Sequence, residues 1–95
     1  PREVEEVIEL DPAVLFAAVI AVPDDIYQEV GWAYIMLQPG SQTSEEAVEA
    51  LCREKLANYK VPKKFFIRSS LPLLANGKID KSALKAEARG MLDEK

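Results

Sequence analysis

The sequence predicts an α+β domain, in which a small, mainly antiparallel sheet of three strands is flanked by about three helices and a β-turn loop carries a lysine. Three observations predict this fold. Two short apolar runs, 14–22 and 30–37, are rich in branched and aromatic residues, as buried strands are. Apolar residues recur at helical spacing in three other segments. An Asn-Gly pair at 76–77 marks a tight turn. A chain of 95 residues is long enough for one such domain with one core.

The first half of the chain predicts a helix followed by a strand pair. Val4, Val7 and Ile8 have helical spacing within residues 2–9, and the Asp-Pro pair at 11–12 ends the helix, because a residue before proline avoids the helical region. The link 23–29 between the two strands is too short for a parallel crossover, so they should pair antiparallel. Trp32 and Tyr34 share one face of the second strand, where we expect core or domain-interface aromatics.

A second helix should follow the strands. Thr43 and Glu46 have the spacing of a capping box, and the helix should end near Asn58. Residues at helical spacing form its apolar face, which should bury an inert Cys52. This face comprises Val48, Leu51, Cys52, Leu56 and Tyr59. A third strand is expected at 64–68.

The last part of the chain predicts a turn and a final helix. Asn-Gly is a strong signal for a tight turn with a positive φ angle. A helix should begin at about Lys81 with Asp80 as its N-cap. Its apolar face should comprise Leu84, Ala88, Met91 and Leu92.

The composition excludes several classes of function. The net charge of −4 argues against nucleic acid as the main partner. A single cysteine, Cys52, rules out an internal disulfide and provides no zinc-binding spacing, and the absence of histidine removes His-dependent triads. We therefore expect no metal site in this chain. The longest apolar run, 13–22, is too short to span a bilayer, so we expect a cytoplasmic protein without a transmembrane segment.

Lys78 is the candidate functional residue. It follows the Asn76-Gly77 turn, where a cation at a rigid loop tip can reach an anion outside the domain. It would act by electrostatics and not as a base, because a lysine is charged at neutral pH. Taken alone, the pattern favours a solvated turn lysine over a functional one.

Several segments resemble the C-terminal domain of the adenylate-forming (AMP-binding) enzymes, which include acyl-CoA synthetases, luciferases and peptide-synthetase adenylation domains. The sequence at 1–5, Pro-Arg-Glu-Val-Glu, is similar to the stretch that enters this domain. The segment 58–63, Asn-Tyr-Lys-Val-Pro-Lys, resembles the Gly-Tyr-Lys-Val-Pro motif, and 71–79 resembles the terminal motif with the catalytic lysine. The strands at 18–24 and 30–40 fall between them in the family's order.

The resemblance implies that residues 1–95 form the mobile C-terminal lid domain of an ATP-dependent acyl-CoA ligase whose large N-terminal adenylation domain is absent from this sequence. Such a ligase converts a carboxylate and ATP into an acyl-adenylate, and then into a thioester with CoA. Lys78 would be the catalytic lysine of the first step, positioned by Asn76, Gly77 and Ile79. Lys60, Lys63 and Lys64 would contact the phosphates of CoA. The alternative for these three lysines is a solvated basic face of an acidic domain.

By the same resemblance, ATP and CoA are substrates and Mg²⁺ is held by the absent large domain, so the isolated chain should be inactive. The sequence departs from the family pattern at Asn58, which replaces the commoner glycine. It also departs at Asp80-Lys81, where many acyl-CoA ligases carry arginines, and this second difference leaves the branch of the family open. The alternatives are a peptide-synthetase lid, whose acceptor is a carrier protein, and a noncatalytic binding module of the same fold.

Overall fold

The computed structural model describes residues 2–24 and 28–93, which form three helices, one short 3₁₀ helix and three strands. The predicted α+β fold is confirmed. The helices are α1 (Arg2–Ile8), α2 (Glu45–Lys55) and α3 (Lys81–Asp93), with η1 at Asn58–Lys60. The strands are β1 (Val14–Asp24), β2 (Gln28–Leu37) and β3 (Lys64–Arg68). Pro1, with which the first motif begins, lies outside the described residues.

The sheet is mixed, with β2 at its centre. β1 and β2 pair antiparallel, as their short link predicted, with Ile20 opposite Trp32. β3 pairs with β2 in parallel. Such a pairing needs a long crossover connection, which the segment containing α2 provides.

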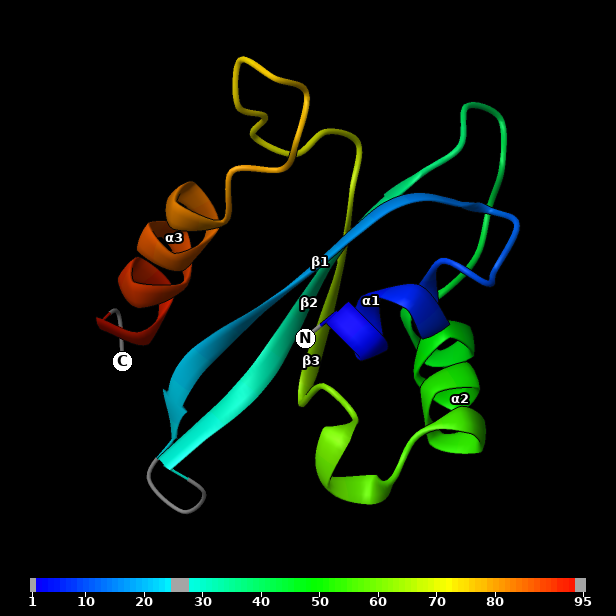
Figure 1. Ribbon diagram of the computed structural model, residues 1–95, viewed down its shortest axis with the longest axis horizontal. Coiled ribbons are helices and arrows are strands. Elements are labelled where there is room, and N and C mark those ends of the chain that lie inside the picture. Colours follow the sequence, from blue (N-terminus) through cyan, green and yellow to red (C-terminus); the bar gives the residue numbers. More distant parts are fainter. Residues whose placement is uncertain (1, 25–27, 94–95) are drawn as a thin grey trace.

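Helices cover both faces of the sheet (Figure 1), with α1 and α2 on one face and α3 on the other. Alternate residues of each strand therefore enter two cores. Ala33 and Ile35 of β2 pack against α1 and α2. Trp32 and Tyr34 face α3 and are buried, which confirms their expected place in the core.

Two glutamates of the helices bind the outer edges of the sheet. The Val19 N–H, on the free side of β1, donates to Glu5 Oε2 at 2.8 Å. On β3, the Ile67 N–H donates to Glu45 Oε2 at 3.3 Å. Because N–H groups alternate along a strand, the nitrogen of Pro23 also points away from β2, where a proline breaks no pairing. This explains why β1 continues past Pro23, although the apolar run was expected to end there.

The predicted capping box of α2 is wrong. Ser44 is the N-cap, and its hydroxyl accepts from the Ala47 N–H at 3.0 Å. The Thr43 hydroxyl instead donates to Asp11 Oδ2 at 3.2 Å, and Glu46 is exposed. Thr43 and Ser44 are neighbours, and the hydroxyl of either could accept from the unpaired N–H groups at the start of α2. The spacing of the motif alone therefore could not decide which of the two is the N-cap.

The second helix also ends earlier than expected. It stops at Lys55, with Leu56 as C-cap, and Tyr59 then lies in η1 with 85% of its surface exposed. Tyr59 is thus not part of the apolar face, because the chain leaves α-helical geometry before reaching it. The rest of that prediction holds for Val48, Cys52 and Leu56, which are buried.

Candidate functional site

The segment from Leu73 to Ile79 is a β-hairpin, closed by an antiparallel bridge between these two residues. The Gly77 N–H donates to the Leu74 carbonyl at 2.9 Å, which makes the tip a β-turn. Gly77 has a φ angle of 87°, in the left-handed region where a side chain is strained. The tight turn with positive φ that Asn-Gly predicted is therefore confirmed.

Lys78 lies beside this turn with its backbone held on both sides. Its N–H donates to Asn76 Oδ1 at 3.0 Å, and its carbonyl accepts from the Leu74 N–H at 2.7 Å. Its side chain is exposed. The next residue, Ile79, packs into the core under α3 and so fixes the returning arm of the hairpin. A cation is thus presented to solvent from a backbone that is held by hydrogen bonds on both sides.

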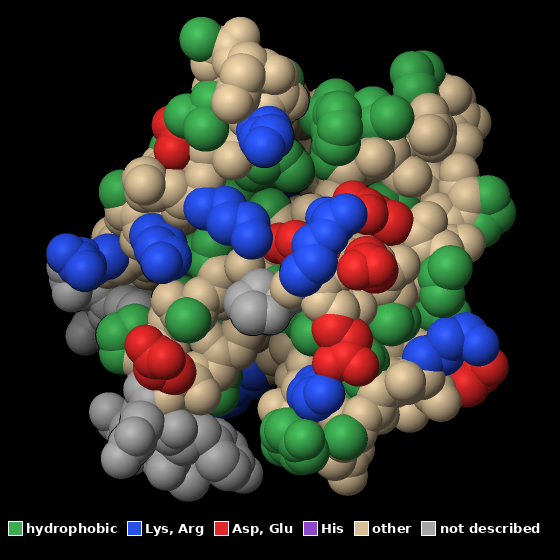
Figure 2. Space-filling model, in the orientation of Figure 1, with side chains coloured by type: hydrophobic (Ala, Val, Ile, Leu, Met, Phe, Trp, Pro, Cys, Tyr) green, Lys and Arg blue, Asp and Glu red, His purple; other side chains and the backbone are tan. Residues whose placement is uncertain are grey.

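The hairpin continues directly into α3. The Asp80 N–H donates to the Pro72 carbonyl at 2.9 Å, which closes the root of the hairpin. Asp80 Oδ1 accepts from the Ala83 N–H at 3.1 Å, so Asp80 is the N-cap of α3, as predicted. Leu84 and Ala88 are fully buried on the inner face of the helix. Figure 2 shows Lys and Arg side chains over α3 and at the adjoining hairpin.

The hairpin also exposes apolar surface. About half of Leu73 and of Leu74 is accessible, at 50% and 46%. Two half-exposed leucines beside an exposed lysine form a tip that offers both apolar contact and a positive charge.

A groove of about 710 Å³ lies at the other end of the sheet, beside η1. Its walls include Gly31, Tyr59, Lys60, Pro62 and Lys63. A Cβ on Gly31 would lie 3.2 Å from Val19 Cγ1, a tight contact, and 3.8 Å from Pro62 Cα, an ordinary one. The Gly31 carbonyl also accepts from the Lys63 N–H at 2.8 Å.

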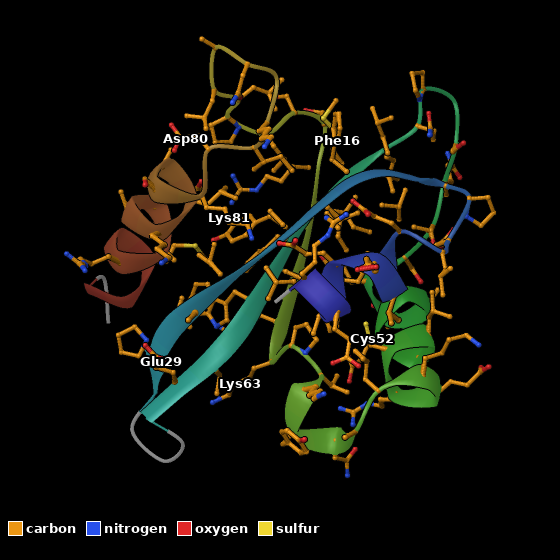
Figure 3. The ribbon with its side chains drawn as sticks, viewed as in Figure 1. Phe16, Glu29, Cys52, Lys63, Asp80 and Lys81 are labelled. Carbon is orange, nitrogen blue, oxygen red and sulfur yellow. The ribbon has the colours of Figure 1, made fainter. Side chains whose placement is uncertain are left out.

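The three lysines expected to contact phosphates do not lie together. Lys60 and Lys63 line the groove. Lys60 Nζ is 2.6 Å from Glu3 Oε1, and this side-chain hydrogen bond, followed by the charge of Glu3, raises the pKa of the Lys60 ammonium. Lys64 lies on the opposite face of the sheet, with its ammonium 5.0 Å from the centre of the Trp32 ring. Figure 3 shows Lys63 near η1, away from Asp80 and the hairpin.

Sequence reasoning missed Glu5, which is buried with 4% of its surface exposed. Its carboxylate binds the Val19 N–H and lies 2.7 Å from Lys81 Nζ. A signal was present, because Glu5 has helical spacing with Ile8 and adjoins Val4, so that it falls on the apolar side of α1.

The part of the chain in residues 2–24 and 28–93 has no helix that is both long and apolar enough to cross a membrane. Within the same residues, no group of three or more Asp, Glu or Cys side chains has an arrangement that could hold a metal ion.

Comparison with known proteins agrees with this geometry. The family described as AMP-binding enzyme C-terminal domain matches residues 3–78. A substituted propanoyl:CoA ligase of Rhodococcus jostii (strain RHA1) is 42% identical over 89 residues, which are 94% of this chain and 17% of that protein. A putative acyl-CoA ligase of Bacillus subtilis (strain 168) is 40% identical over 88 residues, 93% of this chain and 17% of that protein.

Solved structures show the same likeness. Apo MatB from Rhodopseudomonas palustris superposes with a TM-score of 0.85 at 32% identity, over 92% of this chain and 17% of that one. A fatty acyl CoA synthetase of Mycobacterium tuberculosis superposes with a TM-score of 0.82 at 34% identity, also over 92% of this chain and 17% of that one. The chain thus spans about 17% of the length of the relatives that it matches. The family match, the sequence identity and the shared fold together show that the chain belongs to the AMP-binding enzyme C-terminal domains.

Proposed function

We propose that residues 1–95 act as the mobile C-terminal domain of an ATP-dependent, AMP-forming acyl-CoA ligase, with Lys78 as its catalytic lysine. The observation that carries this proposal is the hairpin, which presents the exposed Lys78 from a backbone held by Asn76 and Leu74. The matched relatives are named as CoA ligases, and this supports the proposed class of reaction, the ligation of an acid to CoA.

The reaction would proceed in two steps. A carboxylate oxygen of the substrate attacks the α-phosphorus of ATP, the bond to the β-phosphate breaks, and pyrophosphate leaves. The thiolate of CoA then attacks the acyl carbon, and AMP leaves. Negative charge accumulates around the α-phosphate in the first step, where a preorganised cation lowers the barrier.

Lys78 would serve the first step. Its ammonium would lie between the substrate carboxylate and the α-phosphate, which both sit on the large N-terminal domain expected before this chain. Asn76, Gly77 and Ile79 would act by fixing the backbone from which Lys78 projects. Mg²⁺ would be held with ATP by the large domain.

Lys60 and Lys63 are the better candidates for contacts with CoA phosphates, because both line the groove at η1. Lys64 lies over the Trp32 ring and does not line that groove. Replacing Lys60 or Lys63 with alanine should therefore raise KM for CoA, whereas Lys64→Ala should not. An equal effect of all three substitutions would mean that only the overall charge matters.

The role of Lys78 can be tested in the full-length enzyme that contains this chain. Lys78→Ala should slow ATP–pyrophosphate exchange by about 10²–10³. Thioester formation from supplied acyl-adenylate should remain close to that of the unmodified enzyme. Lys85→Ala, which removes an exposed lysine from α3, is the matched control and should leave both steps unchanged.

Two results would contradict the role assigned to Lys78. Equal loss of both steps in a folded Lys78→Ala enzyme would exclude a role confined to adenylation. Retention of both would exclude a catalytic role.

If a carrier protein accepted the acyl group and CoA did not, the chain would be a peptide-synthetase lid. If neither adenylate nor thioester formed in the unmodified full-length protein, it would be a noncatalytic module.

A further inference from the structure

Glu5 is a carboxylate held inside the protein, and its partners come from two other elements. Its side chain is only 6% exposed. Oε2 accepts from the Val19 N–H of β1 at 2.8 Å and lies 2.7 Å from the Lys81 ammonium of α3. Arg2 approaches the other oxygen from outside at 3.9 Å. A carboxylate this deeply buried is stable as a charge only because it is paired and hydrogen-bonded.

The Glu5–Lys81 ion pair joins the two faces of the sheet. α1 lies on one face and α3 on the other. Lys81 extends from the first turn of α3 toward the free edge of β1 (Figure 3), where Glu5 meets it from α1. The contact therefore links the beginning of α3 to α1.

The beginning of α3 is also the root of the Lys78 hairpin. Lys81 directly follows Asp80, whose N–H closes the hairpin onto Pro72 and whose carboxylate caps the helix. A shift of Lys81 would thus move Asp80, and with it the base of the hairpin. Ile79 is the other anchor of this arm, through the core under α3.

We propose that Glu5 and Lys81 are positioning residues, whose ion pair places the Lys78 hairpin relative to α1. The part of this inference that is tested by measuring catalysis rests on the proposed function. The simpler alternative is that the pair only stabilises the fold. A purely stabilising pair would affect both steps of the reaction through the amount of folded enzyme, whereas a positioning pair would affect the step that uses Lys78.

The variants are chosen to separate these roles in the full-length enzyme. Glu5→Gln keeps an oxygen that can accept from Val19 but removes the charge that Lys81 meets. Lys81→Met removes the ammonium and keeps much of the chain length. Lys81→Arg keeps the charge and is the conservative variant. Glu87→Gln is the matched control, because Glu87 pairs α3 with Arg68 of β3 and reaches neither α1 nor the hairpin.

The first measurement is amide hydrogen exchange by mass spectrometry over residues 71–80. Glu5→Gln and Lys81→Met should each speed exchange of the Leu74, Gly77 and Lys78 amides, which are donors within the hairpin. Exchange in α2 should not change. Lys81→Arg and Glu87→Gln should leave the hairpin as protected as in the unmodified enzyme.

The second measurement compares the two steps of the reaction. Glu5→Gln and Lys81→Met should each lower kcat of ATP–pyrophosphate exchange by about tenfold to a hundredfold, because small displacements of a catalytic group cost this much. Thioester formation from supplied acyl-adenylate should stay within about twofold, and the double variant should lose little more than either single one. Lys81→Arg should restore most of the rate.

The inference is overturned if hairpin exchange does not change, or if both steps fall together in proportion to the folded fraction. Its failure can be told apart from failure of the proposed function. Should Lys78→Ala leave adenylation intact, the proposed function fails, while the exchange measurement still decides whether the ion pair holds the hairpin. Should Lys78→Ala behave as expected and the exchange not change, only the positioning role is lost.

Discussion

The guanidinium carbon of Arg68 lies 5.4 Å from the centre of the ring of Tyr34, which is buried in the core between the sheet and α3. Tyr34 also stacks on Phe66, with 4.9 Å between ring centres and 22° between ring planes. Its hydroxyl nevertheless has no hydrogen-bond partner among the residues that the structure describes. Burial raises the pKa of this phenol, and the charge of Glu87 adds to the effect, while Arg68 opposes it.

The unpaired hydroxyl leads to a prediction about stability. A buried polar group without a partner costs about 1–3 kcal/mol, so Tyr34→Phe should raise the free energy of unfolding by about 1 kcal/mol or leave it unchanged. Tyr34→Leu is the control and should lower it, since the ring contacts with Phe66 and Arg68 are lost. Urea unfolding measures both. A clear loss of stability in Tyr34→Phe would mean that the hydroxyl is hydrogen-bonded after all, for instance to a water molecule.

Cys52 gives a prediction about alkaline pH. Burial, and then the charge of Glu49, raise the pKa of its thiol from 9.0 to about 11. Between these values the unfolded chain loses a proton that the folded chain keeps, so this thiol makes stability fall as pH rises from 9 to 11. The slope that it contributes is at most about 1.4 kcal/mol per pH unit.

The measurement compares the unmodified chain with Cys52→Ala by urea unfolding at several pH values. The difference between the two should shrink steadily above pH 9. Only about one thiol in a thousand is ionised at pH 8 with this pKa, so a disulfide reagent should label native Cys52 slowly and unfolded Cys52 fast. Rapid labelling of the native protein would contradict the burial on which the prediction rests.

The cap of α2 gives a third prediction. Ser44→Ala removes the acceptor of the Ala47 N–H and should cost about 1 kcal/mol of stability. Thr43→Ala should cost less, because its hydroxyl makes one longer hydrogen bond to Asp11 and caps nothing. Thermal unfolding of the two variants decides the order. If Thr43→Ala proved the more harmful, Thr43 would be the effective cap in solution.

Local signals in the sequence were enough to predict most elements. Asn76-Gly77 produced its turn because few other pairs tolerate a positive φ angle, and Asp80 capped α3 because a carboxylate beside the first helical amides has few better partners. The antiparallel pairing of β1 and β2 followed from the short link between them. Lys78 could be named as the candidate from the motif; it is exposed on the hairpin, and its catalytic role stays a prediction.

The features that were missed depend on contacts between distant segments. Whether β3 would join β1 or β2 is not encoded in the residues of β3 themselves, and its parallel register depends on how α2 packs. The Glu5–Lys81 pair joins opposite ends of the chain. Tyr59 matched the helical period of α2, but the helix ended first and turned the ring toward the groove.

The two glutamates at the sheet edges have a consequence for how this domain behaves among its own copies. An open edge strand is a template to which a foreign strand can add, and that addition begins aggregation. Here the Val19 amide of one edge and the Ile67 amide of the other are already bound by side chains that would have to be displaced first. Substituting alanine for Glu5 and Glu45 together would therefore make the chain prone to form intermolecular sheet.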